Sequence, residues 1–271
     1  MHKVFYSTGC VLGRANDRDY RLLRDILPKI DCDEFELMFY SAWYDRVPAF
    51  VDFILSLDAS FPTFHCDKRI GELLAEENFA EAFRLFDINC QIAREVGAKI
   101  MILHLWNGII SDSNISANFS AFPTLQSIAE KHGILLTVEN VLSHNSSPLT
   151  LWHKLLETSP DASFVYDTKM AEFDRENDVC FEPEHIGLWK SVRHMHINDR
   201  AGGYRDWSSI KALHIGEGSV DFDAMFDGLK KVGYTGDFTV EANSINADGS
   251  LRIEDLNHSL QKVRELAKRL K

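Results

Sequence analysis

The chain has 271 residues, close to the roughly 250 typical of one eight-stranded α/β barrel and short for an enzyme of two ordinary domains. Hydrophobic residues make up 45% and charged residues 26%, a composition typical of a folded chain rather than a disordered one. The formal net charge of −12 argues against nucleic acid as a partner, because a polyanion would be repelled on average. We therefore expect one domain, residues 1–271.

The amino-terminal segment from Met1 to Ser7 lacks the charged and apolar regions of a signal peptide, and no apolar run is long enough to span a bilayer. The five cysteines are odd in number, widely spaced and without a CxxC pair. They are Cys10, Cys32, Cys66, Cys90 and Cys180. These features predict reduced thiols, a cytoplasmic location and no membrane partner.

Along the chain, short runs of β-branched and aromatic residues alternate with longer segments of helical periodicity. Strands are predicted at 3–8, 35–39, 62–66, 99–105, 134–140, 163–167, 193–198 and 237–242. Helices are predicted at 18–29, 46–58, 76–96, 121–132, 148–158, 183–190, 221–232 and 253–270. This alternation predicts an α/β fold of the (β/α)8 TIM barrel class.

The segment from Arg200 to Ser219 is the irregular stretch, with two glycine-containing turns and a Trp207-Ser208-Ser209 run. Loops of more than about 12–15 residues in compact domains are usually functional or disordered. We expect this loop to lie at the mouth of the barrel.

Six potential metal ligands end successive predicted strands, from the third to the eighth. They are His65, His104, Glu139, Asp167, His196 and Glu241. The carboxyl ends of parallel barrel strands meet at one mouth, where such barrels keep their active sites. Carboxylates and neutral imidazoles together suit Mn²⁺, Zn²⁺, Co²⁺ or Mg²⁺.

Each of these residues also has a simpler interpretation. A single His at a strand end is more often a hydrogen-bonded wall residue, and Asp167 before Thr168 can cap a helix. Glu139 and Glu241 are harder to explain in this way, because each follows an apolar run that would bury its carboxylate. The six residues together favour a divalent-metal site.

The ordered motifs resemble the xylose isomerase-like barrel superfamily, which includes sugar isomerases and epimerases, inosose dehydratase and the endonuclease IV group. The motifs are Phe64-His65-Cys66, Ile102-Leu103-His104, Thr137-Val138-Glu139-Asn140, Tyr166-Asp167-Thr168, His194-Met195-His196-Ile197-Asn198-Asp199, Gly216-Glu217-Gly218-Ser219-Val220-Asp221-Phe222 and Val240-Glu241. The resemblance covers nearly the whole chain. As a set the motifs are specific for the superfamily, but none identifies a substrate.

The resemblance implies roles for these residues. It makes Glu139, Asp167, His196 and Glu241 the metal ligands, and it makes His65 and His104 either substrate contacts or part of a second metal position beside Glu139. Asp199 would contact substrate, orient His196 or hold a neighbouring backbone, with loop capping equally open. Trp106 would stack on a sugar face or simply pack.

Two departures narrow the resemblance. The endonuclease IV group has a third-metal His three residues after the strand-six Asp, where this chain has Met170, and an Asp-Arg-His segment where this chain has Lys211-Ala212-Leu213-His214. The ketose 3-epimerases carry a second Glu soon after the strand-five Glu, whereas this chain continues Asn140-Val141-Leu142. A trinuclear phosphodiesterase site and a close match to the 3-epimerases are both disfavoured.

The favoured function is metal-dependent isomerisation or epimerisation of a small sugar or polyol, with Glu139 and Glu241 as the catalytic acid–base pair acting through an enediolate. Three alternatives stay open. They are a keto-polyol dehydratase of the inosose dehydratase kind, an endonuclease IV-like phosphoester hydrolase and a non-catalytic sugar-binding barrel. The sequence does not fix the substrate, its phosphorylation, the metal or whether the chain forms a homo-oligomer.

Overall fold

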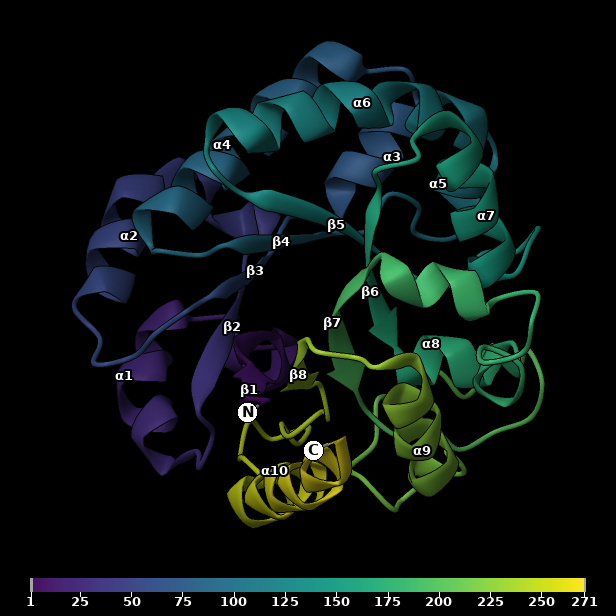
Figure 1. Ribbon diagram of the computed structural model, residues 1–271. Coiled ribbons are helices and arrows are strands. Elements are labelled where there is room, and N and C mark those ends of the chain that lie inside the picture. Colours follow the sequence, from purple (N-terminus) through teal and green to yellow (C-terminus); the bar gives the residue numbers. More distant parts are fainter. Residues whose placement is uncertain (1, 271) are drawn as a thin grey trace. The chain divides into compact units, whose positions relative to one another are not determined.

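The computed structural model describes residues 2–270, and its parallel strands follow the order β1-β2-β3-β4-β5-β6-β7-β8 in a closed barrel (Figure 1). The strands are β1 (Val4–Ser7), β2 (Glu34–Met38), β3 (Thr63–His65), β4 (Ile100–Leu103), β5 (Leu135–Glu139), β6 (Ser163–Asp167), β7 (Val192–Ile197) and β8 (Asp237–Val240). All eight predicted strands are confirmed, and the (β/α)8 barrel class with them.

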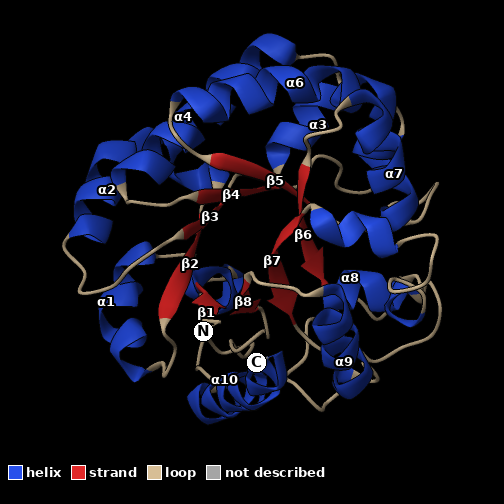
Figure 2. Ribbon diagram, in the orientation of Figure 1, coloured by secondary structure: helices blue, strands red, loops and turns tan. Residues whose placement is uncertain are grey.

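Helices connect the strands (Figure 2). They are α1 (Leu23–Ile26), α2 (Val47–Leu55), α3 (Arg69–Ala75), α4 (Phe79–Glu95), α5 (Ile109–Asp112), α6 (Ile115–Lys131), α7 (Pro148–Thr158), α8 (Thr168–Phe173), α9 (Phe222–Val232) and α10 (Ile253–Ala267). Short 3-10 turns fill several of the remaining connections. Among the helices within residues 2–270, none is long and apolar enough to cross a lipid bilayer.

Two compact units make up the chain: one contains the residues up to Glu36 and those from Tyr166 onward, and the other runs from Leu37 to Val165. In the first unit, α10 packs against β1 and β8. In the second, α3, α4 and α6 pack on one another, and α6 also lies against β5. The expectation of a single domain remains a prediction.

The strands are short and almost wholly buried, as parallel strands covered by helices must be. Every residue of β6 is buried, and only Leu135 of β5 is exposed. Within the second unit the register is regular, with Ile102 of β4 opposite Thr137 of β5 and Glu139 opposite Val165 of β6. This register places the last residues of neighbouring strands at the same end of the sheet.

Local signals set the helix boundaries. Ser147 caps α7 by accepting a hydrogen bond from the Thr150 backbone N–H, and Pro148 occupies the first turn, where its missing N–H costs nothing. Asp221 caps α9 in the same way, and Gly233 ends it with a positive φ of 66°.

The predicted helices differ from the observed ones at several positions. The segment predicted as one helix at 18–29 is a 3-10 turn, one turn of α-helix and a second 3-10 turn that contains Pro28. The helix predicted at 183–190 is wrong, because only a 3-10 turn forms at Ile186–Lys190. Helices α3, α5 and α8 were not predicted.

Candidate metal centre

The six predicted residues all lie at the carboxyl ends of strands. His65, Glu139 and Asp167 are the last residues of β3, β5 and β6, and His196 is the last but one of β7. His104 and Glu241 each follow their strand, β4 or β8, by one residue. Three of them, Asp167, His196 and Glu241, belong to the first compact unit, and the other three to the second.

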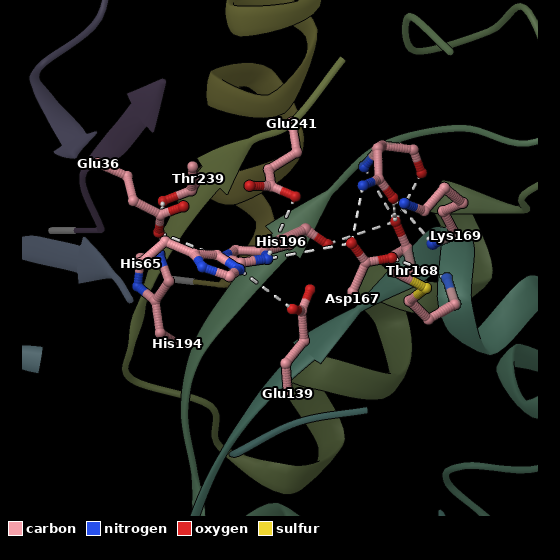
Figure 3. A network of polar contacts seen from close by, with 12 residues as sticks. Glu36, His65, Glu139, Asp167, Thr168, Lys169, His194, His196, Thr239 and Glu241 are labelled. Atoms are coloured by element: carbon pink, nitrogen blue, oxygen red, sulfur yellow. Dashed lines mark hydrogen bonds and ion pairs between the residues drawn. The ribbon is translucent and has the colours of Figure 1, made fainter. Parts of the chain in front are cut away.

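In the first unit, the fully buried His196 ring lies among three carboxylates (Figure 3). Its Nδ1 atom is 3.5 Å from Oε2 of Glu241 and 4.0 Å from Oδ2 of Asp167. Its Nε2 atom is 3.1 Å from Oε2 of Glu36. One ring nitrogen therefore faces two predicted metal ligands, while the other has a carboxylate partner of its own.

Each carboxylate oxygen of Asp167 has a partner of its own. Its Oδ1 atom accepts a hydrogen bond from the Met170 backbone N–H, at 2.8 Å, and so caps α8. Its Oδ2 atom accepts one from the Asn198 side chain, at 2.9 Å, and is the oxygen nearest His196. The cap and the amide hold the carboxylate in a fixed orientation.

Glu36 was missed by the sequence analysis. It lies in β2, is fully buried, and accepts hydrogen bonds from the His196 ring and from the Thr239 hydroxyl, the latter at 3.3 Å. The alternation in Glu34-Phe35-Glu36-Leu37 is typical of a strand with one polar, solvated face, so the pattern indicates that Glu36 is exposed to solvent. The burial of its carboxylate is the feature that marks Glu36 as a candidate site residue.

In the second unit, His65, His104 and Glu139 converge. The Nε2 atoms of the two histidines are 3.1 Å apart. Oε2 of Glu139 is 2.5 Å from Nε2 of His104 and 3.5 Å from Nε2 of His65. The Nδ1–H group of His65 donates to the carbonyl oxygen of Cys66, so the Nε2 atom of a neutral His65 ring carries a lone pair. Electron-rich atoms so close together require a proton or a metal ion between them.

Burial controls the protonation of His104. It lowers the pKa of the His104 imidazole to about 4, an effect to which Lys68 adds and which Glu139 opposes. The ring is therefore neutral at neutral pH, which is the form that binds metals.

The other two predicted site residues are held by the protein itself. Trp106 is fully buried and donates from Nε1 to the carbonyl oxygen of Val141, at 2.6 Å. Asp199 accepts backbone N–H bonds from Arg200, Gly216, Gly218 and Val220 at 2.8 to 3.1 Å. Substrate contact by either residue stays a prediction, and in each case it competes with these structural bonds.

The donor sets suit a divalent cation. Within each compact unit, buried histidine and carboxylate groups lie close enough together to share an ion: His65, His104 and Glu139 in one, and Glu36, His194 and His196 in the other. Imidazole and carboxylate donors without thiolate are the set that Zn²⁺ and Mn²⁺ accept in enzymes. Buried clusters of this protein can therefore hold a metal.

Comparison with known proteins gives one curated relative, the uncharacterized protein MJ1311 of Methanocaldococcus jannaschii. The two chains are 27% identical over 184 residues, which span 64% of this chain and 60% of that relative.

Solved structures share the fold at low identity. A D-tagatose 3-epimerase-like protein matches with a TM-score of 0.73 and 18% identity over 99% of this chain and 98% of its own. An L-ribulose 3-epimerase matches at 0.72 and 13% over 100% and 96%, and the IOLI protein, solved with a bound zinc atom, at 0.69 and 13% over 99% and 97%. These likenesses show the fold alone.

The family comparison covers most of the chain. The model described as xylose isomerase-like TIM barrel matches residues 34–270, which include all six strand-end residues and Glu36. This protein belongs to the xylose isomerase-like TIM barrel family.

Proposed function

We propose that this chain is a metal-dependent isomerase or epimerase of a small sugar or polyol. The observation that carries the proposal is the His196 ring, whose Nδ1 faces Glu241 and Asp167 while its Nε2 is bonded to Glu36. A histidine that turns one nitrogen toward carboxylates and anchors the other on a further carboxylate has the arrangement of a metal ligand.

The proposed ligands are Glu139, Asp167, His196 and Glu241, for Mn²⁺, Zn²⁺, Co²⁺ or Mg²⁺. Asp167, His196 and Glu241 are neighbours in one compact unit. The inclusion of Glu139 is supported by its donor type, by its place at the end of β5, and by the strand order β5-β6-β7-β8. When bound, such an ion supplies Lewis-acid polarisation of a substrate carbonyl and the adjacent hydroxyl.

Glu139 and Glu241 would move the proton. One carboxylate removes the proton from the carbon next to the carbonyl, and the other returns a proton to the enediolate that results. Their environments differ, because the Glu139 side chain is 1% exposed and the Glu241 side chain 13%. Glu241 is therefore the better placed of the two to exchange its proton with water.

His65 and His104 would hydrogen-bond the substrate oxygens, with Trp106 and Asp199 as further predicted contacts. The epimerases of similar fold support a sugar as substrate. The zinc in the IOLI structure likewise supports a metal in a barrel of this kind.

The test is turnover of free and phosphorylated ketoses and of keto-polyols by protein loaded with each of the four ions, in D₂O. The expected result is a new epimer or isomer with deuterium on the carbon next to the carbonyl, detected by NMR. Loss of water from the substrate instead would establish the dehydratase alternative. Sugar binding that is insensitive to metal, without turnover, would establish a non-catalytic barrel.

A second function has an observation in its favour. The convergence of the His65 and His104 Nε2 atoms on Oε2 of Glu139 is the geometry of a further metal position, as phosphoester hydrolysis on two ions would need. Metal counts on His65→Ala and His104→Ala separate the two functions. The isomerase proposal expects one ion to remain in both variants, whereas loss of an ion from both would favour the hydrolase.

A further inference from the structure

We propose that Glu36 is a positioning residue: it fixes the tautomer of His196 so that Nδ1 presents its lone pair to the metal ion, and it places a negative charge behind the ring. The inference rests on the proposed function, because it assigns the residue that prepares one of the proposed ligands. Glu36 itself touches neither substrate nor ion in this proposal.

A chain of hydrogen bonds with a single direction leads to Glu36. The Thr239 hydroxyl donates to Oε2 of Glu36, at 3.3 Å, so its oxygen is left to accept from Nε2–H of His194, at 2.6 Å. The same Oε2 atom receives the Nε2–H group of His196, at 3.1 Å. Oε2 of Glu36 therefore accepts from two donors, which fixes the direction of both hydrogen bonds.

The His196 tautomer follows from this contact. A neutral imidazole carries one hydrogen, and a hydrogen on Nε2 leaves Nδ1 with a lone pair. Nδ1 is the atom that faces Glu241 and Asp167. Without Glu36 the hydrogen could move to Nδ1, where it would donate to these carboxylates and block the metal ligand.

Burial gives the second argument. Glu36, His194, His196 and Thr239 each expose 1% of their surface or less. An ionised carboxylate in such surroundings is costly unless a positive charge lies close by. A divalent ion on the far nitrogen of the same ring would supply that charge, as in other carboxylate–histidine–metal arrangements.

An ion held directly by Glu36, His194 and His196 explains the contacts less well. The Thr239 hydroxyl bonds Nε2 of His194 and Oε2 of Glu36, and it would compete with such an ion for these two atoms. Figure 3 shows this hydroxyl beside the Glu36 carboxylate, with Glu241 approaching His196 separately. The group therefore supports the ligand and is not itself the site.

The experiment compares Glu36→Gln and Glu36→Leu with wild type in two measurements. The first is the dissociation constant for Mn²⁺, by competition with a chelating dye. The second is the ring tautomer of His196 in the metal-free protein, by ¹⁵N NMR of labelled histidine assigned with His196→Gln. Glu34→Gln is the matched control, because Glu34 lies in the same strand and pairs with Lys3 instead.

We expect wild type to show the Nε2–H tautomer. Both Glu36 variants should weaken Mn²⁺ binding about 10- to 100-fold, as loss of a supporting carboxylate does in other metal sites. Glu36→Leu should also lose the preference for Nε2–H, while Glu34→Gln should behave as wild type.

Two results would overturn the inference: an Nδ1–H tautomer in wild type, or Mn²⁺ affinity unchanged in both Glu36 variants. The wild-type spectrum decides the first even where a variant does not fold. Failure of the proposed function would give a different result. Wild type would then bind none of the four ions, but the His196 tautomer in the metal-free protein would still show whether Glu36 fixes it.

Discussion

Asp174 shows how a buried charge in this chain depends on pH. Its side chain is 1% exposed, neither carboxylate oxygen has a hydrogen-bond partner within residues 2–270, and its nearest cation is Arg205, at 3.5 Å. Burial raises the pKa of Asp174 to about 6, although Arg205 and Arg200 both act to lower it. The folded state thus binds a proton more tightly than the unfolded state does.

The sign of the effect on stability follows from linkage. While the carboxyl group is protonated in both the folded and the unfolded state, its raised pKa does not affect the free energy of unfolding. As pH rises from about 4 through 6, the raised pKa lowers the free energy of unfolding by an increasing amount. We expect Asp174→Asn to be more stable than wild type at pH 8, by about 1 kcal/mol after a discount for solvent screening near Arg205, and equal to it below pH 4. Urea unfolding at several pH values measures this.

The control for that series is Asp178→Asn, because Asp178 is exposed. It should change stability little at any pH. A loss of stability in Asp174→Asn at pH 8 would mean that the ion pair with Arg205 outweighs the cost of burial.

The two glutamates proposed as the acid–base pair give the sharpest residue-scale prediction for activity. Glu139→Gln and Glu241→Gln keep the shape of the side chain but remove a base and a negative ligand. Each should lower kcat by about 10²- to 10⁴-fold, with lost metal affinity adding to the effect. Steady-state kinetics with the substrate found in the turnover screen, at saturating metal, provides the measurement.

Glu184→Gln makes the same chemical change at an exposed position and should keep full activity. Full activity in either Glu139→Gln or Glu241→Gln would rule out the two-glutamate mechanism. Circular dichroism of each variant separates lost chemistry from lost folding.

The sequence predicted the strand-end residues well because a parallel barrel puts every strand end at one mouth. That rule holds for His196 and Glu241 without knowledge of any side-chain contact. The rule did not identify Glu36, because the contacts of Glu36 are with residues of β7 and β8 more than 150 residues away in sequence. Hydrogen-bond partners across a barrel are a property of the fold and cannot be derived from periodicity.

At the scale of elements, the strands were predictable and the connecting turns were not. Buried parallel strands are apolar runs with clear ends, whereas α3, α5 and α8 have at most seven residues, too few for a periodic pattern. Helix α8 begins at Thr168 and is capped by Asp167. The capping role of Asp167 was visible in the sequence, but it did not predict how long the helix would be.

Gly71 lets α3 lie directly against the backbone of His104, one of the candidate site residues. A Cβ atom added there would lie 2.5 Å from the carbonyl oxygen of His104 and 3.0 Å from that of Leu105. The side-chain amide of Asn118, in α6, donates hydrogen bonds to the carbonyl oxygens of Gly71 and Leu105 and so holds these two backbone segments together. The helix can approach the end of β4 only because residue 71 lacks a side chain.

We therefore expect Gly71→Ala to destabilise the fold by about 1–3 kcal/mol, although alanine is the better helix former by about 1 kcal/mol. Gly187→Ala is the matched control, because nothing lies within 4 Å of its added Cβ. Chemical denaturation of both variants tests this. Equal stability of Gly71→Ala and wild type would show that the end of β4 can move away, and that His104 is less fixed than its contacts indicate.

At the scale of the whole molecule, acidic residues dominate. The chain has 41 Asp and Glu against 29 Lys and Arg, and three of its carboxylates surround one imidazole. Like charges that share a buried site repel one another, so the folded state carries an electrostatic cost there that a cation would relieve. Metal binding should consequently appear in the stability of the entire fold.

Removal of bound metal with a chelator should lower the melting temperature, and Mn²⁺, Zn²⁺, Co²⁺ or Mg²⁺ should restore it. An ion at about 100 times its dissociation constant stabilises the native state by about 2.7 kcal/mol, which corresponds to a rise of about 5–10 °C for a chain of this size. Differential scanning calorimetry of the metal-free protein with each ion measures the shift.

Two histidine variants provide the controls for this shift. His196→Gln should abolish it, because the His196 ring provides the nitrogen that faces Glu241 and Asp167. His132→Gln should leave it unchanged, because His132 pairs with Asp87 at the surface. If the melting temperature responds to none of the four ions, no cation balances the carboxylates around His196. The assignment of the metal centre would then be wrong.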